Sequence, residues 1–160
     1  MSEVRIGNGF DVHQLENGEN IILCGVKISH NKKLVGHSDA DVGLHSLTDA
    51  ILGALGKGDI GRWFPPSDVQ WENADSAIFL LKALKLMEQE KFSIANIDMT
   101  FICEQPKITK YHKKMTIRLA KLCNIQPDKI NIKATTSEGL GYTGREEGIA
   151  VLTSLLLQKE

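Results

Sequence analysis

The sequence predicts an α+β fold in which helices pack on one face of a mixed β-sheet. Strand-like and helix-like segments follow one another without the strict alternation of a βαβ protein, and the first strand-like segments are close enough in sequence to pair directly. The chain has 160 residues, 42% of them hydrophobic, which is enough for one compact core and too little for two ordinary domains. We therefore expect residues 1–160 to form a single domain.

The N-terminal part of the chain predicts two strands and a helix. Apolar residues alternate weakly from Glu3 to His13, and a second β-branched run extends from Ile21 to Ile28. These two runs predict a hairpin that turns at Gly18. From Asp41 the apolar spacing becomes helical, and Gly56 provides a stop signal for this helix.

The rest of the chain predicts an exposed loop, two helices and three strands. The loop from Asp59 to Trp71 contains two prolines, which do not fit inside a helix. The elements expected after it are a helix capped by Asn73 or Asp75 and running through Met87, a strand from Ile97 to Cys103, a helix from Thr109 to Cys123, a strand from Ile130 to Ala134, a glycine-rich turn from Gly139 to Gly148, and a last strand through Leu157.

Composition excludes several classes of partner. The formal net charge of -1 provides no overall field that would attract nucleic acid or an anionic membrane. The N-terminus lacks the features of a signal peptide, and no apolar run is long enough to span a membrane. Cys24, Cys103 and Cys123 are odd in number and widely spaced, which favours a reducing compartment over a disulfide framework. We expect a cytoplasmic protein.

Two clusters of acidic residues and histidines predict a metal site. Asp11 and His13 are two residues apart in a predicted strand, so their side chains leave the same face. Asp41, His45 and Asp49 recur every four residues along one face of the predicted helix. Asp11, His13 and His45 form a mixed oxygen and nitrogen set that suits Zn²⁺ and leaves one coordination position for substrate. Taken singly, Asp41 also fits a helix cap and His45 a buried core histidine.

The glycine-rich turn has the composition of a phosphate-binding segment. Thr135 and Thr136 supply hydroxyl donors, Arg145 offers a bidentate donor, and the glycines allow close approach of backbone N–H groups. The carboxylate of Glu138 fits this setting if it holds a hard divalent cation between phosphates. The alternative is a purely structural turn in which Arg145 pairs with Glu147.

Five segments resemble the 2-C-methyl-D-erythritol 2,4-cyclodiphosphate synthase family in order and spacing. They are RIGNGFDVH, HSDADVGLH, DIGRWFPPSD, CEQPKI and KATTSEGLGYTGREEG, and together they cover essentially the whole chain. The resemblance implies conversion of 4-diphosphocytidyl-2-C-methyl-D-erythritol 2-phosphate to the cyclic diphosphate and CMP, in non-mevalonate isoprenoid biosynthesis. It also implies a homotrimer with active sites at the subunit interfaces.

The resemblance also implies roles for individual residues. Asp11, His13 and His45 would bind one Zn²⁺ per subunit, and Glu138 would bind a Mg²⁺ or Mn²⁺ ion that bridges the substrate phosphates. His37 and Thr136 would be the catalytic residues that orient the phosphates. The residues expected to contact the cytidine diphosphate substrate are Asp11, His13, His37, Ser38, Asp59, Ile60, Gly61, Phe64, Pro65, Pro66, Ser67, Asp68, Cys103, Glu104, Gln105, Pro106, Lys107, Ile108, Thr109, Thr135, Thr136, Ser137, Glu138, Tyr142 and Arg145.

Two other functions are compatible with the same residues. A zinc phosphodiesterase or pyrophosphohydrolase would use the cations to activate water and would release a linear product. A non-catalytic protein would use Asp11, His13 and His45 for structural zinc, with His37 or Asp41 as the fourth ligand. The absence of a serine or cysteine nucleophile with an adjacent base favours direct phosphoryl transfer over covalent catalysis.

Overall fold

The computed structural model describes residues 3–159 and has the predicted α+β architecture. One layer is a five-stranded sheet with the order β4–β1–β7–β5–β6. Its strands are β1 (Glu3–Asn17), β4 (Lys32–Val35), β5 (Ser93–Ile102), β6 (Ile130–Thr135) and β7 (Gly148–Lys159). The second layer consists of helices α1 (Val42–Ala54), α3 (Ala77–Gln89) and α4 (His112–Cys123).

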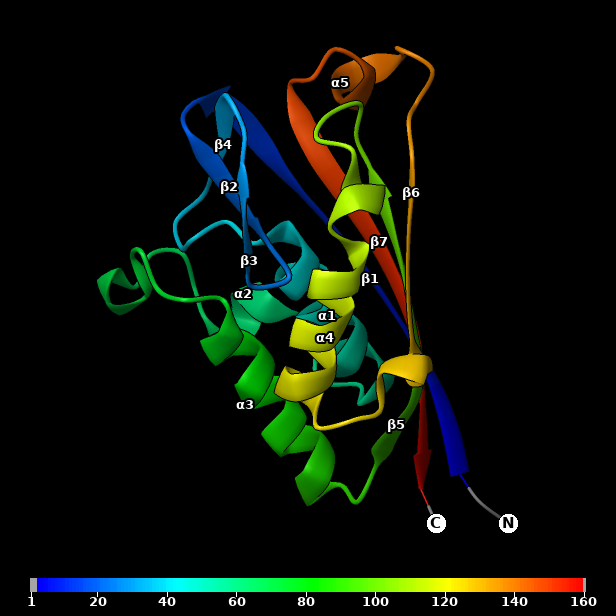
Figure 1. The fold of residues 1–160 in the computed structure, drawn as a ribbon. Coiled ribbons are helices and arrows are strands. Elements are labelled where there is room, and N and C mark those ends of the chain that lie inside the picture. Colours follow the sequence, from blue (N-terminus) through cyan, green and yellow to red (C-terminus); the bar gives the residue numbers. More distant parts are fainter. Residues whose placement is uncertain (1–2, 160) are drawn as a thin grey trace.

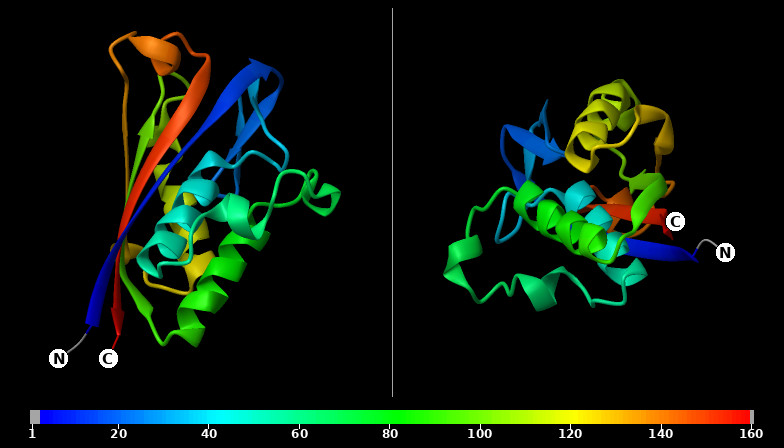
Figure 2. Two further views of the ribbon diagram at one scale, coloured as in Figure 1. Left: turned by 180° about the vertical axis from the view of Figure 1, so that it is seen from behind. Right: turned by 90° about the horizontal axis from the view of Figure 1, so that it is seen from below.

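The helices cover one face of the sheet, as the sequence predicts (Figures 1 and 2). Only the β5–β6 pair is parallel among the sheet pairs of the described residues, and α4 forms the connection between these two strands. The shorter elements are α2 (Ile60–Trp63), α5 (Gly141–Gly144) and three 3₁₀ turns at Val69–Trp71, Ile108–Lys110 and Pro127–Lys129. Within residues 3–159, none of the helices combines the length and apolarity needed to cross a membrane.

The predicted hairpin between the first two apolar runs is wrong. Instead, β1 pairs antiparallel with β7, from Glu3 opposite Lys159 to Gln14 opposite Gly148. The run from Ile21 to Ile28 folds back on itself into a separate two-stranded ribbon, β2 (Asn20–Leu23) and β3 (Val26–Ser29). The turn between β2 and β3 has positive φ at both residues, which only Gly25 adopts without steric cost, and this local signal marks the reversal.

Two glycines determine how close α1 lies to the sheet. A Cβ atom on Gly9 would lie 1.8 Å from the carbonyl oxygen of Ser46, and one on Gly7 would lie 1.9 Å from that of Ala50. Any larger residue on this face of β1 would therefore push the helix away. The Ser46 hydroxyl donates to the Gly9 carbonyl (3.0 Å), which satisfies a polar group buried at this contact.

Several helix and strand boundaries differ from the predicted ones. The helix α3 follows Ser76, and Asp75 rather than Asn73 accepts a backbone hydrogen bond at its start, from Ala77 (2.9 Å). The helix α4 begins at His112 because the preceding residues form a 3₁₀ turn. The strand β4 and the short helix α2 were not predicted, since each is only four residues long.

The outer face of the sheet carries exposed apolar side chains. These residues are Val4, Ile6, Phe10, Val12 and Leu152. Phe10 lies opposite Leu152 in the β1–β7 pairing, so the patch extends across two neighbouring strands. Contiguous apolar surface on a sheet is a common feature of protein interfaces.

Candidate functional site

Three potential metal ligands meet where α1 crosses β1. Asp11 and His13 project from the inner face of β1, two and four residues beyond Gly9, and His45 lies on the first turn of α1. The ligand atoms of these residues all lie within 4.8 Å of one another. His13 Nε2 lies 3.0 Å from Asp11 Oδ2 and 3.0 Å from His45 Nδ1. Because α1 packs closely on β1 at Gly7 and Gly9, His45 on α1 lies next to Asp11 and His13 on the strand.

In each of the two histidines, one ring nitrogen points into the triad and the other points away from it. The hydrogen-bond partner of the outer nitrogen indicates where the proton of the neutral ring lies. His13 Nδ1 lies 2.9 Å from the carbonyl oxygen of Val35, which can only accept, so this nitrogen carries the proton. His45 Nε2 lies 2.7 Å from Ser76 Oγ. With both outer nitrogens donating, the two inner nitrogens and the Asp11 carboxylate direct lone pairs at one point. This arrangement fits a bound divalent cation.

The charges of the triad reinforce one another. Burial opposes ionisation of Asp11, but when the inner nitrogens of His13 and His45 carry protons, their hydrogen bonds and positive charge lower the pKa of this carboxyl to about 2. Burial also opposes the charge on His13, but the hydrogen bond and negative charge of Asp11 outweigh it and raise the pKa of this imidazole above its usual value. A proton on His13 therefore competes with a cation at this position.

The triad opens into a cavity of about 330 Å³, here called the triad cavity. Besides the three ligands, it is lined by His37, Ser38, Ile60, Gly61, Phe64, Pro66, Trp71 and Phe79. Phe64, Trp71 and Phe79 pack against one another, with ring centroids 4.5 to 5.9 Å apart. The cavity thus has ionic ligands on one wall and an aromatic cluster on the other.

Four of the residues predicted around this cavity have other positions. Asp59 and Asp68 accept backbone hydrogen bonds at the starts of α2 and the 3₁₀ turn at Val69–Trp71. Pro65 and Ser67 do not line the triad cavity. The Asp68 carbonyl oxygen lies 3.4 Å from His37 Nε2 and so connects the loop to the cavity. Trp71 and Phe79 were missed; Trp71 lies in the 3₁₀ turn at Val69–Trp71, and Phe79 lies on the first turn of α3.

The other acidic residues of the α1 face have structural roles. Asp41 is fully buried, accepts the backbone N–H groups of Leu44, Cys24 and Gly25 (2.7 to 3.0 Å), and so caps α1 and holds the β2–β3 ribbon on it. The cap alternative for Asp41 is confirmed. Asp49 accepts the N–H of Ile60 (2.7 Å) and connects α1 to α2. Neither joins the triad.

A second cavity lies at the ends of β5 and β6. It has a volume of about 100 Å³ and is here called the Lys107 cavity. It is lined by Cys103, Pro106, Lys107, Ile108, Thr109, Ala134, Thr135 and Thr136. Seven of these eight were predicted from the sequence, and Ala134 was not. No residue lines both this cavity and the triad cavity.

The glycine-rich turn lies near the Lys107 cavity and is braced by Glu104, two residues beyond the end of β5. Glu104 Oε1 accepts the N–H groups of Ser137 (3.2 Å) and Gly139 (3.4 Å), so its carboxylate supports the turn. Glu138 has a positive φ of 56°. Arg145 forms the predicted alternative pair with Glu147, with Nε 2.9 Å from Oε1. That pair leaves the phosphate-binding role of Arg145 as a prediction.

Tyr142 lines a different groove, together with Val12, His13, Gln14, Glu147 and Gly148. Gln105 lines neither the triad cavity nor the Lys107 cavity. Glu138 also lines neither of these cavities. The structure of one chain thus places most of the predicted residues in two separate cavities and leaves Tyr142, Gln105 and Glu138 outside both.

The chain is similar to known proteins along nearly its whole length. The family model described as the YgbB family matches residues 4–158. A bifunctional enzyme IspD/IspF of Paracoccus denitrificans is 55% identical over 157 residues, which cover 98% of this chain and 41% of that protein. The chain thus spans about two fifths of the length of this curated relative.

Two solved structures have the same fold. The bifunctional IspDF of Campylobacter jejuni superposes with a TM-score of 0.95 and 41% identity, over 100% of this chain and 43% of that one. A CDP-bound 2C-methyl-D-erythritol-2,4-cyclodiphosphate synthase superposes with a TM-score of 0.88 and 35% identity, over 96% of this chain and 99% of that one. On the family match and these identities, this chain belongs to the YgbB family.

Proposed function

We propose that this chain catalyses the intramolecular closure of a cyclic diphosphate. The substrate would be 4-diphosphocytidyl-2-C-methyl-D-erythritol 2-phosphate, and the products 2-C-methyl-D-erythritol 2,4-cyclodiphosphate and CMP. The observation that carries this proposal is the open Asp11–His13–His45 triad at the wall of a cavity large enough for a sugar phosphate. Family membership supports it, because a relative with this fold is a CDP-bound cyclodiphosphate synthase.

In the proposed reaction, a 2-phosphate oxygen attacks the β-phosphorus of the same molecule. A new P–O bond forms, the bond from the β-phosphorus to the bridging oxygen breaks, and CMP leaves with that oxygen. The reaction needs no water molecule and forms no covalent intermediate with the protein. Because both reacting groups belong to one molecule, the main task of the protein is to fold the substrate and neutralise its charge.

Two cations would assist, one of them Zn²⁺ on Asp11, His13 and His45 and the other Mg²⁺ or Mn²⁺ on Glu138. Such cations supply charge neutralisation at the phosphoryl oxygens. His37 and Ser38 line the triad cavity and are placed to donate to a phosphate. Lys107 and Thr135 line the Lys107 cavity, which we assign to the cytidine side, and Thr136 in the same cavity would orient the phosphates together with His37. Asp59 and the loop residues Pro65 to Asp68 would contact the erythritol and its phosphate, and Glu104 and Gln105 would contact the nucleotide. Further substrate contacts would come from Ser137, Tyr142 and Arg145.

We further propose that the protein is a homotrimer whose active sites form between subunits. The two clusters of site residues line separate cavities within one chain, and the sheet exposes an apolar patch on its outer face. A second copy that brings its Lys107 cavity to the triad cavity of the first would complete the site. The three buried free cysteines support the cytoplasm as its compartment.

Incubation with the cytidine substrate and a divalent metal in H₂¹⁸O tests the reaction. Cyclisation predicts CMP and a cyclic diphosphate, both resolved by phosphorus NMR, with no ¹⁸O in either product. A zinc hydrolase would incorporate one ¹⁸O atom into a linear product, which would overturn the proposal. A chelator separates the proposal from the structural-zinc alternative. If zinc is catalytic, the chelator should abolish turnover while the circular dichroism spectrum stays unchanged, whereas unfolding of the chain on metal removal would favour structural zinc.

Sedimentation equilibrium tests the assembly. Ile6, whose side chain is 73% exposed on the outer sheet face, is replaced by Glu. Burying that charge between subunits without a partner is costly, so Ile6→Glu should sediment as a monomer. Val69→Glu is the matched control, because Val69 is 77% exposed on the loop before α3 and lies outside the patch. An unaltered trimer with Ile6→Glu would exclude this face as the interface.

A further inference from the structure

The triad cavity has a hydrogen-bonded support behind His45. His45 Nδ1 faces Asp11 Oδ2 at 3.2 Å, so this nitrogen is the one available to a cation. The opposite nitrogen, Nε2, lies 2.7 Å from the hydroxyl oxygen of Ser76, which is fully buried at the start of α3. The Ser38 hydroxyl lies farther from the same nitrogen, at 3.2 Å. Ser76 is therefore the principal partner of the outer side of His45.

Ser76 is in turn bound to a carboxylate. Its hydroxyl donates to Asp39 Oδ1, and its backbone N–H donates to Asp39 Oδ2 (3.1 Å). The Asp39 carboxylate also accepts the backbone N–H of Asp41 (3.1 Å). An ionised carboxylate has no proton to donate, so the single hydroxyl proton of Ser76 belongs to the Asp39 bond. The Ser76 oxygen must then accept from His45 Nε2–H.

We infer that Asp39 and Ser76 are positioning residues that orient His45 and increase its basicity as a metal ligand. This inference rests on the proposed function, in which the triad binds a divalent cation. The Asp39–Ser76–His45 relay, as we call it, holds the proton on Nε2 and so keeps Nδ1 free for the cation. A carboxylate at the end of the relay also favours electron donation by the imidazole, as outer hydrogen-bond partners of metal-bound histidines do.

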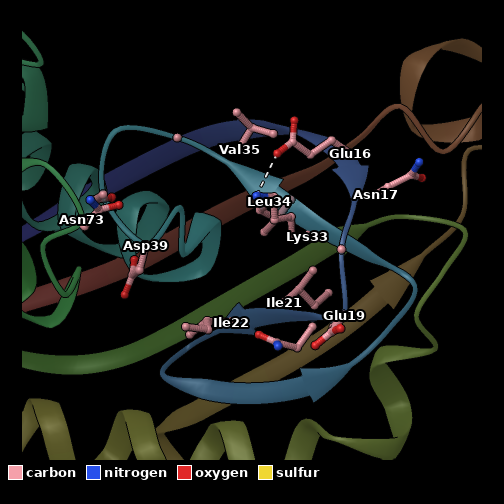
Figure 3. A pocket seen from close by; sticks show the side chains of 14 residues that line it. Glu16, Asn17, Glu19, Ile21, Ile22, Lys33, Leu34, Val35, Asp39 and Asn73 are labelled. Carbon is pink, nitrogen blue, oxygen red and sulfur yellow. Dashed lines mark ion pairs between the residues drawn. The ribbon is translucent and has the colours of Figure 1, made fainter.

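The relay lies between two cavities. Ser38 lines the triad cavity and also a larger cavity of about 650 Å³, here called the Glu16 cavity, which Asp39 lines as well. Figure 3 shows Asp39 on one side of the Glu16 cavity and Glu16, ion-paired to Lys33 at 3.0 Å, on another. Asp39 is half-buried, whereas Ser76 and His45 are buried. Asp39, at one end of the relay, is thus accessible from the Glu16 cavity, which the three triad residues do not line.

This geometry provides a matched pair of variants. Asp39→Asn and Glu16→Gln each replace one carboxylate of the Glu16 cavity by the amide of the same size. Both change the net charge equally, but only Asp39→Asn alters the relay. Ser76→Ala removes the middle of the relay, and the double variant of Ser76→Ala with Asp39→Asn tests whether the two residues act as one unit.

The test measures the zinc dissociation constant of each intact protein by competition with a chromophoric chelator at one pH. We expect binding about 10-fold to 100-fold weaker for Asp39→Asn and for Ser76→Ala, and no further weakening in the double variant. Glu16→Gln should bind as the unaltered protein does. In the Co²⁺-substituted proteins, the visible ligand-field spectrum should shift for the two relay variants and not for Glu16→Gln.

Equal affinities for Asp39→Asn and Glu16→Gln, with unchanged Co²⁺ spectra, would overturn the relay. If Ser76→Ala fails to fold, the isosteric Asp39→Asn decides the question alone. An unaltered protein that binds zinc without forming cyclic product would overturn only the proposed reaction, because the affinities would still test the relay. An unaltered protein that binds no divalent metal would overturn both.

Discussion

The triad cavity and the Lys107 cavity differ in how their residues are held. The triad cavity is braced within the chain, because the ligands sit on a long strand and a buried helix, and each histidine has an outer hydrogen-bond partner. At the Lys107 cavity, Thr135 is exposed and Thr136 is half-buried, and the adjacent glycine-rich turn bonds mainly within itself and to Glu104. The first region is preorganised for a cation, whereas the second presents polar groups that a single chain leaves uncovered.

The largest expected effect concerns the triad cavity. His45→Ala should weaken metal binding more than about a hundredfold, beyond the loss typical of an outer hydrogen-bond partner, and should abolish turnover. The oligomer should remain assembled, because His45 lies on the helix side of the sheet and away from the outer patch. Equilibrium dialysis and sedimentation measure the two properties. His30→Ala is the control, and full activity in His45→Ala would refute the metal assignment.

A mixing experiment asks whether the two regions work across subunits. His45→Ala damages the triad cavity, and Glu138→Gln damages the glycine-rich turn, so each should be inactive alone. If a site takes one region from each of two neighbouring subunits, random co-assembly in equal amounts should restore about a quarter of the sites. Co-expressed, differently tagged chains would be purified and assayed for CMP release. Recovery no greater than the sum of the separate variants would place the whole site within one chain.

The contact between α1 and β1 should be sensitive to one methyl group. Gly9→Ala places a Cβ atom 1.8 Å from the Ser46 carbonyl oxygen, so α1 must shift and carry His45 away from Asp11. We expect a loss of about 1–3 kcal/mol in the free energy of unfolding, together with weaker metal binding. Gly53→Ala is the control, because its Cβ would have no neighbour closer than 3.7 Å. Urea denaturation should show this control to be neutral or more stable than the unaltered protein.

The smallest expected effect is a difference in pH dependence with and without metal. The pKa of Asp11 is lowered to about 2, so its contribution to stability is present above its ordinary value of 3.8 and is lost as the pH falls toward 2. The pKa of His13 is raised above 6.5, so its contribution is present below 6.5 and is lost as the pH rises through the raised value. The metal-free pair should therefore stabilise the protein most between these limits.

Metal binding should have the opposite slope, because the cation must displace the proton of His13. Its affinity should rise by up to about tenfold per pH unit for one displaced proton, until the pH passes the raised pKa of His13. Thermal unfolding with chelator and with Zn²⁺, at pH 5 to 8, should show a Tm difference that widens as the pH rises toward that value. A constant difference across this range would contradict the predicted competition.

Local patterns predicted much of the metal site. Alternation along β1 correctly placed Asp11 and His13 on one face, and helical spacing placed His45 on the first buried turn of α1. Pairing of strands was not predictable in the same way. The partner of β1 is β7, at the other end of the chain, and no local pattern encodes a contact of that separation.

The sequence by itself determined the fold class, the order of most elements and the residue types of the triad, because strand and helix periodicities and ligand chemistry are local properties. The tertiary structure alone decided that Gly7 and Gly9 allow α1 to pack closely on β1, and that Ser76 and Asp39 form the hydrogen bonds behind His45. It also decided that Asp41 caps α1 and that Arg145 pairs with Glu147. These contacts join residues of different elements, so they depend on how closely the elements pack rather than on spacing along the chain.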